Sequence, residues 1–257
     1  MRLIEQATKE ALAQNPDAEV MSIISEGKKY WVKRARKSGS RTFHRVAYGL
    51  LKHPLLVPSL PCYPSGALAH EVGKLVRLAQ KEIHVPEVIA QQSTFFVLED
   101  QGSSVLNAIR NGEVSDVNGV LEKVIALLAS LHVKGEFHGG AQIKNFTCKD
   151  EKVFAIDFEE AFDGAIPVVD LQFRDLFLFL FPLAKHGIEA DYAALIGLYE
   201  KQVSNGASQR MRALARSFGW LTRLAHTGVM QKVLDQDPKS AFRLLRILGA
   251  LEFEEGA

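Results

Sequence analysis

The spacing of apolar residues changes along the chain from short β-like segments to long helical ones, which predicts an α+β protein. Helical spacing predicts helices over 3–14, 67–80 and 117–133. Segments rich in β-branched and aromatic residues predict strands at 20–24, 29–33, 85–89 and 94–98, the first two forming a hairpin. After Gly102 the pattern is mostly helical. We therefore expect a small N-terminal lobe over 1–100 and a larger helical lobe over 101–257.

The predicted helix over 67–80 carries an acidic residue inside its apolar stripe. Leu68, Leu75 and Leu78 form the stripe, and Glu71 lies within it rather than opposite it. Glu71 is therefore either partly buried, which would require a cationic partner, or an ordinary helix-surface carboxylate. Before this helix, four prolines between 54 and 64 predict that no regular element forms there.

Length and composition describe an ordinary globular protein. The chain has 257 residues, 47% hydrophobic and 24% charged, which excludes collagen-like, disordered and disulfide-scaffold classes. Cys62 and Cys148 have no metal-ligand spacing and predict reduced thiols. The longest apolar run, 176–184, is nine residues long and contains Pro182, whereas a membrane-spanning helix needs about 20. The N-terminus does not resemble a secretory signal, so we expect a cytoplasmic protein.

The formal net charge of +1 conceals a strongly basic segment. Between Gly27 and His70 there is no acidic residue, and nine lysines and arginines give this segment +9, which leaves −8 for the rest of the chain. Aromatic and leucine residues are interleaved with these cations. Residues 28–52 therefore predict a surface that binds an anionic lipid or lipopolysaccharide, which would place the protein at the periphery of the inner membrane. A nucleic acid is a less favoured partner of this segment. A solvated charged face is the alternative.

The densest group of chemically useful residues lies between 137 and 159. A loop with His138, Gly140 and Asn145 precedes a polar, hairpin-like link at 147–152, and Asp157 follows an apolar strand. Amide and carboxylate oxygens are suited to a Mg²⁺ ion that also carries a phosphate. As alternatives, Asn145 is a turn residue, Asp157 is a strand-end cap and His138 hydrogen-bonds its own loop.

These motifs resemble the protein-kinase-like superfamily. Residues 138–145 have the eight-residue length of the kinase catalytic loop, and Asp157-Phe158-Glu159 resembles the metal-binding Asp-Phe-Gly. The segment 30–33, Tyr-Trp-Val-Lys, resembles the strand that carries the phosphate-pairing lysine. More narrowly, the chain resembles the bacterial lipopolysaccharide-core (Kdo/heptose) kinases and their toluene tolerance relatives, over roughly residues 20–185.

The resemblance implies a bilobal kinase-like fold and ATP- and Mg²⁺-dependent transfer of a phosphoryl group to a sugar hydroxyl. The residues to which it gives roles are Lys33 for the nucleotide phosphates, Glu71 for holding Lys33, Leu98 and Asp100 in the nucleotide-binding hinge, His138 and Gly140 in the catalytic loop, Asn145 and Asp157 for Mg²⁺, and Asp175 for supporting the loop backbone. Two more residues also have alternatives: Lys33 as a solvated surface lysine, and Asp175 as the cap of an apolar helix that Arg174 opens.

Two departures from the family bear on activity. Gly140 stands where active members carry the aspartate that accepts the proton of the attacking hydroxyl, and no carboxylate occurs between His138 and Lys149. The hairpin turn at 25–28 offers a single glycine in place of a glycine-rich phosphate loop. A positioned base contributes about 10²–10⁴-fold to the rate. The sequence therefore predicts a slow enzyme or a pseudokinase that binds a nucleotide or a partner, with nucleic-acid binding through the basic segment as a third class.

Overall fold

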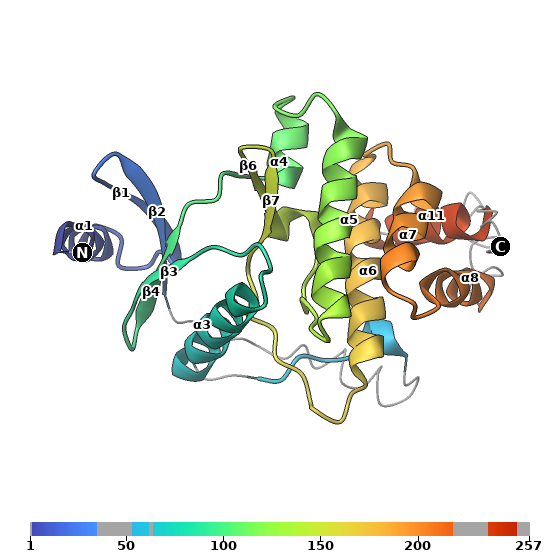
Figure 1. The fold of residues 1–257 in the computed structure, drawn as a ribbon, viewed down its shortest axis with the longest axis horizontal. Helices are drawn as coiled ribbons and strands as arrows, with labels where there is room; N and C mark the ends of the chain where they lie inside the picture. The colour runs from blue at the N-terminus through green and yellow to red at the C-terminus, as the bar shows by residue number, and fades with distance from the viewer. Residues whose placement is uncertain (1, 35–52, 62–63, 218–235, 251–257) are drawn as a thin grey trace. The chain divides into compact units, whose positions relative to one another are not determined.

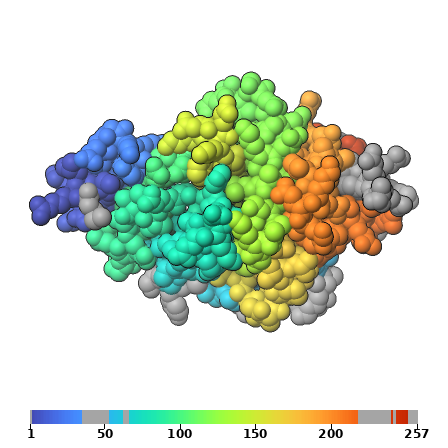
Figure 2. All heavy atoms as spheres, in the orientation of Figure 1, coloured from blue at the N-terminus to red at the C-terminus, as the bar shows by residue number. Residues whose placement is uncertain are grey.

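The computed structural model describes residues 2–34, 53–61, 64–217 and 236–250, and the remainder is grey in Figure 1 and Figure 2. The prediction of an α+β protein is confirmed. The chain divides into two compact units. Unit 1 comprises Met1–Ser103 and Thr147–Ile166, and unit 2 comprises Ser104–Phe146 and Pro167–Ala257. Thr147–Ile166, which the sequence assigned to the C-terminal lobe, thus groups with the N-terminal part.

Unit 1 is built on a four-stranded antiparallel sheet of order β1-β2-β4-β3 (Figure 1). The strands are β1 (Val20–Ser25), β2 (Lys28–Arg34), β3 (Val88–Gln91) and β4 (Phe95–Glu99). The predicted β1–β2 hairpin is confirmed. Its turn residues Glu26 and Gly27 both have positive φ, 52° and 74°, as a tight hairpin turn requires. Strand β3 begins later than predicted, after Pro86, which has no N–H for a ladder.

Helix α1 (Arg2–Gln14) covers one face of this sheet. Apolar residues of α1, β1, β2 and β4 form a common core there, with Ile4, Met21 and Val32 among its members. The guanidinium of Arg34 donates to the carbonyl oxygens of Leu12, Asn15 and Pro16, at 2.6, 3.1 and 2.8 Å. These bonds satisfy carbonyls that a helix end leaves without partners, and they fasten α1 to strand β2.

Helix α3 (Pro64–Gln80) contacts β3 and β4. The helix begins at Pro64, three residues before the predicted start, because proline is well accommodated in a first helical turn. The prediction that residues 54–64 contain no regular element is wrong for one turn, since η1 (Pro54–Leu56) is a 3₁₀ helix. The side chain of His53 accepts a hydrogen bond from the Leu55 N–H at the start of that turn.

A second sheet has the order β5-β6-β7, and its strands are β5 (Ser103–Ser104), β6 (Phe146–Lys149) and β7 (Lys152–Ala155). The hairpin-like link predicted at 147–152 is most of β6, a turn and the first residue of β7. The turn residues Asp150 and Glu151 have φ of 48° and 62°, the same left-handed geometry as the first hairpin. Asp157 follows two residues after the end of this hairpin.

Gly102 leads into β5 with a φ of 81° and lies against the backbone of β6. A Cβ at this position would meet the Cys148 carbonyl oxygen at 2.2 Å. We expect Gly102→Ala to lower the free energy of unfolding by about 3 kcal/mol, through left-handed strain and overpacking. Gly112→Ala is the matched control, with a φ of 70° and no described atom within 4 Å of the added Cβ, and should cost about 1 kcal/mol. Equal losses in urea unfolding would contradict the prediction.

In its described residues, unit 2 is helical apart from short segments. Its helices are α4 (Val105–Arg110), α5 (Val117–Val133), the 3₁₀ turn η2 (Ile143–Asn145), α6 (Val168–His186), α7 (Tyr192–Gln202), α8 (Ala207–Ser217) and α11 (Gln236–Ala250). Helix α5 has the predicted bounds and packs against α7, while α6 packs against α11. In the part of the chain that is described, no helix is both long and apolar enough to cross a membrane.

Candidate functional site

In unit 1, one ammonium group joins three segments that are far apart in the sequence. Lys33 on β2 donates to Glu71 Oε1 on α3 at 2.7 Å and to Asp157 Oδ1, after β7, at 2.5 Å. The cationic partner expected for Glu71 is therefore present. The side chains of Lys33 and Glu71 are only 15% and 4% exposed, so neither is the surface residue of the alternative interpretation.

Burial and charge act in opposite directions on this cluster. Burial would lower the pKa of Lys33, but the neighbouring carboxylates of Glu71 and Asp157 outweigh it and raise that pKa above its ordinary value. Burial raises the pKa of Glu71, and the charge of Lys33 opposes this shift. Lys33 therefore stays protonated at neutral pH and supplies a fixed positive charge beside two carboxylates.

Asp157 lies in an unusual backbone conformation. Its φ is 68°, in the left-handed region that few residues other than glycine and asparagine or aspartate adopt. The next residue, Phe158, is fully buried, and the Lys74 ammonium lies 5.5 Å from the centre of its ring. Strand β7 ends at Ala155, and the Asp157 side chain pairs with Lys33. Its side chain is 33% exposed and can still reach a ligand.

The two residues expected in the hinge contact Trp31. Leu98 on β4 lies opposite Trp31 in the register of the sheet and is 9% exposed. Asp100 Oδ1 accepts a 2.7 Å hydrogen bond from Trp31 Nε1 and lies 3.4 Å from Lys29 Nζ, while its Oδ2 accepts from the Gly102 N–H. The Asp100 carboxylate is therefore used within unit 1 to hold the indole.

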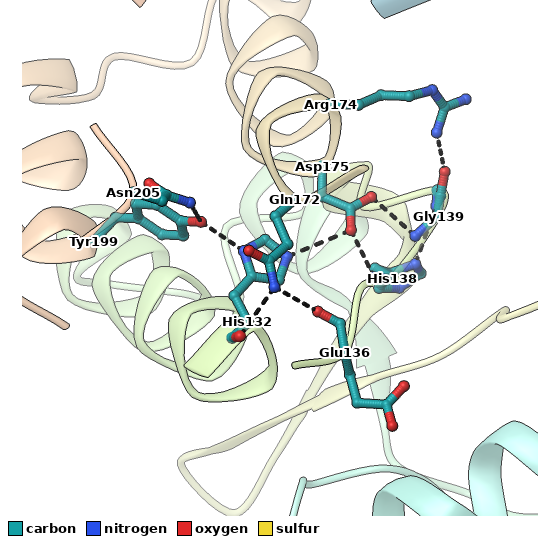
Figure 3. Close-up of polar contacts among 10 residues, drawn as sticks. His132, Glu136, His138, Gly139, Gln172, Arg174, Asp175, Tyr199 and Asn205 are labelled. Atoms are coloured by element: carbon teal, nitrogen blue, oxygen red, sulfur yellow. Dashed lines mark hydrogen bonds and ion pairs between the residues drawn. The ribbon is translucent and has the colours of Figure 1, made fainter. Parts of the chain in front are cut away.

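In unit 2, the loop 138–140 is held from helix α6. Asp175 Oδ2 accepts from the His138 N–H at 2.6 Å, and Oδ1 accepts from the Gly139 N–H at 2.9 Å (Figure 3). The expected support of the loop backbone is present. The alternative, a cap at the start of a helix, is wrong because α6 begins at Val168 and Arg174 and Asp175 lie in its second turn.

Burial alone would raise the pKa of Asp175, which is fully buried. The hydrogen bond from His132 and the positive charge of Arg174 outweigh this effect and hold the pKa below its ordinary value. Asp175 therefore stays ionised, and its two oxygens act only as acceptors.

Gly139 is fixed through both of its peptide groups. Its N–H bonds to Asp175 and its carbonyl oxygen accepts from Arg174, the preceding residue of α6 (Figure 3). Its φ of 98° lies in the region that favours glycine. His138 Nδ1 accepts a 3.2 Å hydrogen bond from the Gly140 N–H, as expected of a histidine that pins its own loop.

Asn145 closes the other end of this loop. Its Nδ2 donates to the Gly140 carbonyl oxygen at 2.8 Å, which leaves Oδ1 as the atom available to a cation. Among the described residues, no group of three or more histidines, cysteines, aspartates and glutamates is placed to hold a metal. An amide and a carboxylate still fit Mg²⁺, which keeps several waters and phosphate oxygens as ligands. Asn145 and Asp157 belong to different units, so a metal shared between them stays a prediction.

Sequence reasoning missed the residues that support the loop 138–140. Arg174 bonds the loop directly, and His132 and Tyr199 act through Asp175 (Figure 3). Gln172 bonds the carbonyl oxygens of His132 and Glu136, which precede the loop. Only Arg174 had a local signal, as the neighbour of Asp175. His132, Gln172 and Tyr199 lie on helices, and a single sequence does not specify how those helices pack against the loop.

Most of the basic segment predicted to bind an anionic partner, residues 35–52, lies outside the described residues. Of the basic residues within 28–34, Lys33 and Arg34 serve inside unit 1, and Lys29 pairs with Asp100. Part of the +9 counted in the sequence therefore balances internal carboxylates and carbonyls, and the anionic partner stays a prediction.

Comparison with known proteins adds little to this geometry. No protein-family model matches the chain. An uncharacterized protein of Haemophilus influenzae is 29% identical over 157 residues, which are 60% of this chain and 59% of that protein. The chain thus spans less than two thirds of the length of this relative. Function must therefore be argued from the site itself.

Proposed function

We propose that this protein is a bilobal, kinase-like phosphotransferase that uses ATP and Mg²⁺ to phosphorylate a sugar hydroxyl of lipopolysaccharide-core type. The observation that supports this most is the meeting of Lys33 with Glu71 and Asp157 at 2.7 and 2.5 Å. The family resemblance singled out these three residues, which lie on three separate segments of the chain.

Each residue of this cluster has a distinct task in the proposal. The buried Glu71 orients Lys33, whose fixed charge would bind nucleotide phosphates. Asp157 keeps an exposed carboxylate edge for Mg²⁺, which would neutralise charge that develops during transfer. Because phosphoryl transfer depends mainly on positioning and charge neutralisation, this cluster can supply much of the catalysis without a base.

In unit 2, the proposal gives the loop 138–140 the position of a catalytic loop. Asp175 and Arg174 hold the backbone of Gly139, and Asn145 holds Gly140. Asn145 would offer its Oδ1 to the metal. His138 acts on the loop backbone and not on a substrate proton.

A catalytically inactive pseudokinase is the second candidate, and Gly140 favours it. The position expected to hold the base carries no side chain, and the loop to Lys149 has no carboxylate. This candidate expects nucleotide or partner binding without turnover. Phosphoryl transfer that Asn145→Ala abolishes would exclude it.

Thermal unfolding with Mg-ATP tests the proposal. At about ten times its Kd, Mg-ATP should raise the Tm by about 3–6 °C. Asp157→Ala should abolish the part that depends on Mg²⁺, while leaving Lys33 paired with Glu71. Asp163→Ala is the matched control, because Asp163 is an exposed carboxylate of the same segment that bonds the Ala165 N–H. No shift in the wild type, or an equal shift in Asp157→Ala, would contradict the proposal.

A further inference from the structure

The support of the loop 138–140 does not end at Asp175. His132 Nε2, at the end of α5, lies 3.4 Å from Asp175 Oδ2, and His132 Nδ1 lies 2.7 Å from the Tyr199 hydroxyl on α7. Asn205, after α7, donates from Nδ2 to the same hydroxyl at 3.0 Å. These side chains form one continuous chain from Asn205 to the loop (Figure 3).

The direction of each hydrogen bond in this series of side chains follows from the two residues at its ends, Asp175 and Asn205. The ionised Asp175 only accepts, so His132 Nε2 must carry a proton. The Asn205 amide donates to the Tyr199 oxygen, so the Tyr199 proton is directed to His132 Nδ1. With Nε2 protonated and Nδ1 accepting, His132 matches the direction of both hydrogen bonds that its ring makes. Burial raises the pKa of Tyr199, which keeps its hydroxyl protonated as a donor.

Burial makes this arrangement sensitive to the loss of any one member. His132, Asp175 and Tyr199 are 3%, 0% and 0% exposed, so water cannot replace a missing partner. Gln172 adds a second restraint, because its Nε2 donates to the carbonyl oxygens of His132 and Glu136, which lead into the loop. His132 thereby restrains the Asp175 carboxylate, and Gln172 restrains the backbone that leads into the loop.

We propose that Tyr199 and Asn205 are positioning residues for the loop 138–140, acting through His132 and Asp175. Tyr199 restrains the His132 ring through Nδ1, the Nε2–H of that ring orients the Asp175 carboxylate, and the carboxylate sets the peptide groups of His138 and Gly139. The importance of the loop rests on the proposed function. The positioning itself is a property of unit 2.

NMR of the full chain labelled with ¹⁵N tests this inference, through the shifts of the His132 ring nitrogens and of the His138 and Gly139 amide protons. In the wild type we expect His132 nitrogen shifts of the Nε2-protonated tautomer and a downfield His138 amide proton, because its bond to Asp175 is 2.6 Å long. Tyr199→Phe should change the His132 Nδ1 shift, because Nδ1 loses its hydrogen-bond donor, and should move the His138 and Gly139 amide protons upfield. Asn205→Ala should move the same signals in the same direction by a smaller amount. This variant provides the test if Tyr199→Phe does not fold.

Tyr192→Phe is the matched control. Tyr192 is a buried tyrosine of the same helix, 7% exposed, outside the Asn205–Asp175 chain. Its substitution should leave the His132 nitrogen shifts and both amide signals unchanged. A loss of stability in Tyr199→Phe with the His138 and Gly139 amide signals unchanged would overturn the inference, because a merely structural tyrosine does not act on the loop. If the signals move while wild-type protein shows no Mg-ATP shift, the positioning holds and the proposed function fails.

Discussion

Replacing Gly140 by aspartate is expected to raise the rate of ATP hydrolysis by about 10²–10⁴-fold, the usual contribution of a positioned base. The structure accommodates a side chain here. A Cβ on Gly140 would lie 3.7 Å from Asn145 Nδ2, an ordinary van der Waals contact. Gly140 also lies outside the positive-φ positions, unlike Gly139 with its φ of 98°. Release of phosphate from Mg-ATP under initial-rate conditions measures the effect.

Two further variants separate a base from a change of shape. Gly140→Asn adds nearly the same volume without a basic carboxylate and should leave the rate within a few fold of wild type. Adding Asn145→Ala to Gly140→Asp should remove the gain, because Asn145 holds the Gly140 carbonyl and offers an oxygen to the metal. Equal rates for Gly140→Asp and Gly140→Asn would show that the missing carboxylate does not limit this protein.

Lys33→Met is expected to lower the free energy of unfolding by about 3–5 kcal/mol at neutral pH, the cost of leaving a buried charge without its partner. The charge concerned is Glu71, whose side chain is 4% exposed. Burial raises the folded-state pKa of Glu71, and removal of Lys33 takes away the charge that opposes this shift. With the folded pKa above the unfolded one, the loss should shrink as the pH falls and Glu71 binds a proton.

A double variant and a control on the same strand test that explanation by urea unfolding. Lys33→Met with Glu71→Gln removes both charges and should recover at least half of the lost free energy. Lys29→Met removes a lysine that is 46% exposed and 3.4 Å from Asp100, so it should cost less than about 1 kcal/mol. A double variant as unstable as Lys33→Met would show that packing of the lysine stem, rather than its charge, carries the effect.

The sequence predicted those elements whose signals are local. The apolar spacing of α5 reproduced its bounds, and the turn chemistry of Glu26-Gly27 located the first hairpin. The start of α6 was missed by several residues because Val168 and Val169 are exposed, at 41% and 40%, and give no clear helical stripe. Strand β3 begins after Pro86, because proline has no N–H for the ladder. The sequence shows this proline, but the apolar run 85–89 favoured an earlier start.

For the candidate site, the same distinction separates what was predicted from what was missed. A cationic partner for Glu71 followed from its place in an apolar stripe, and the family resemblance identified that partner as Lys33. The ion pair of Lys33 with Asp157, and the contacts of Tyr199 and Asn205, depend on long-range packing that no spacing encodes. The left-handed backbone of Asp157 was equally hidden, because an aspartate after a strand is compatible with several conformations.

The discontinuity of unit 1 has a consequence for synthesis of the chain. Thr147–Ile166, which carries Asp157, is translated after the first segment of unit 2. At 5–20 residues per second, the about sixty residues from Ser104 to Ile166 take roughly 3–13 s to be made. During that interval a nascent Lys33 has one of its two carboxylates, and the hairpin β6–β7 does not yet exist. Unit 1 therefore cannot form all of its contacts until Thr147–Ile166 has been synthesised. A gene fragment ending at Ser103 would encode only part of unit 1.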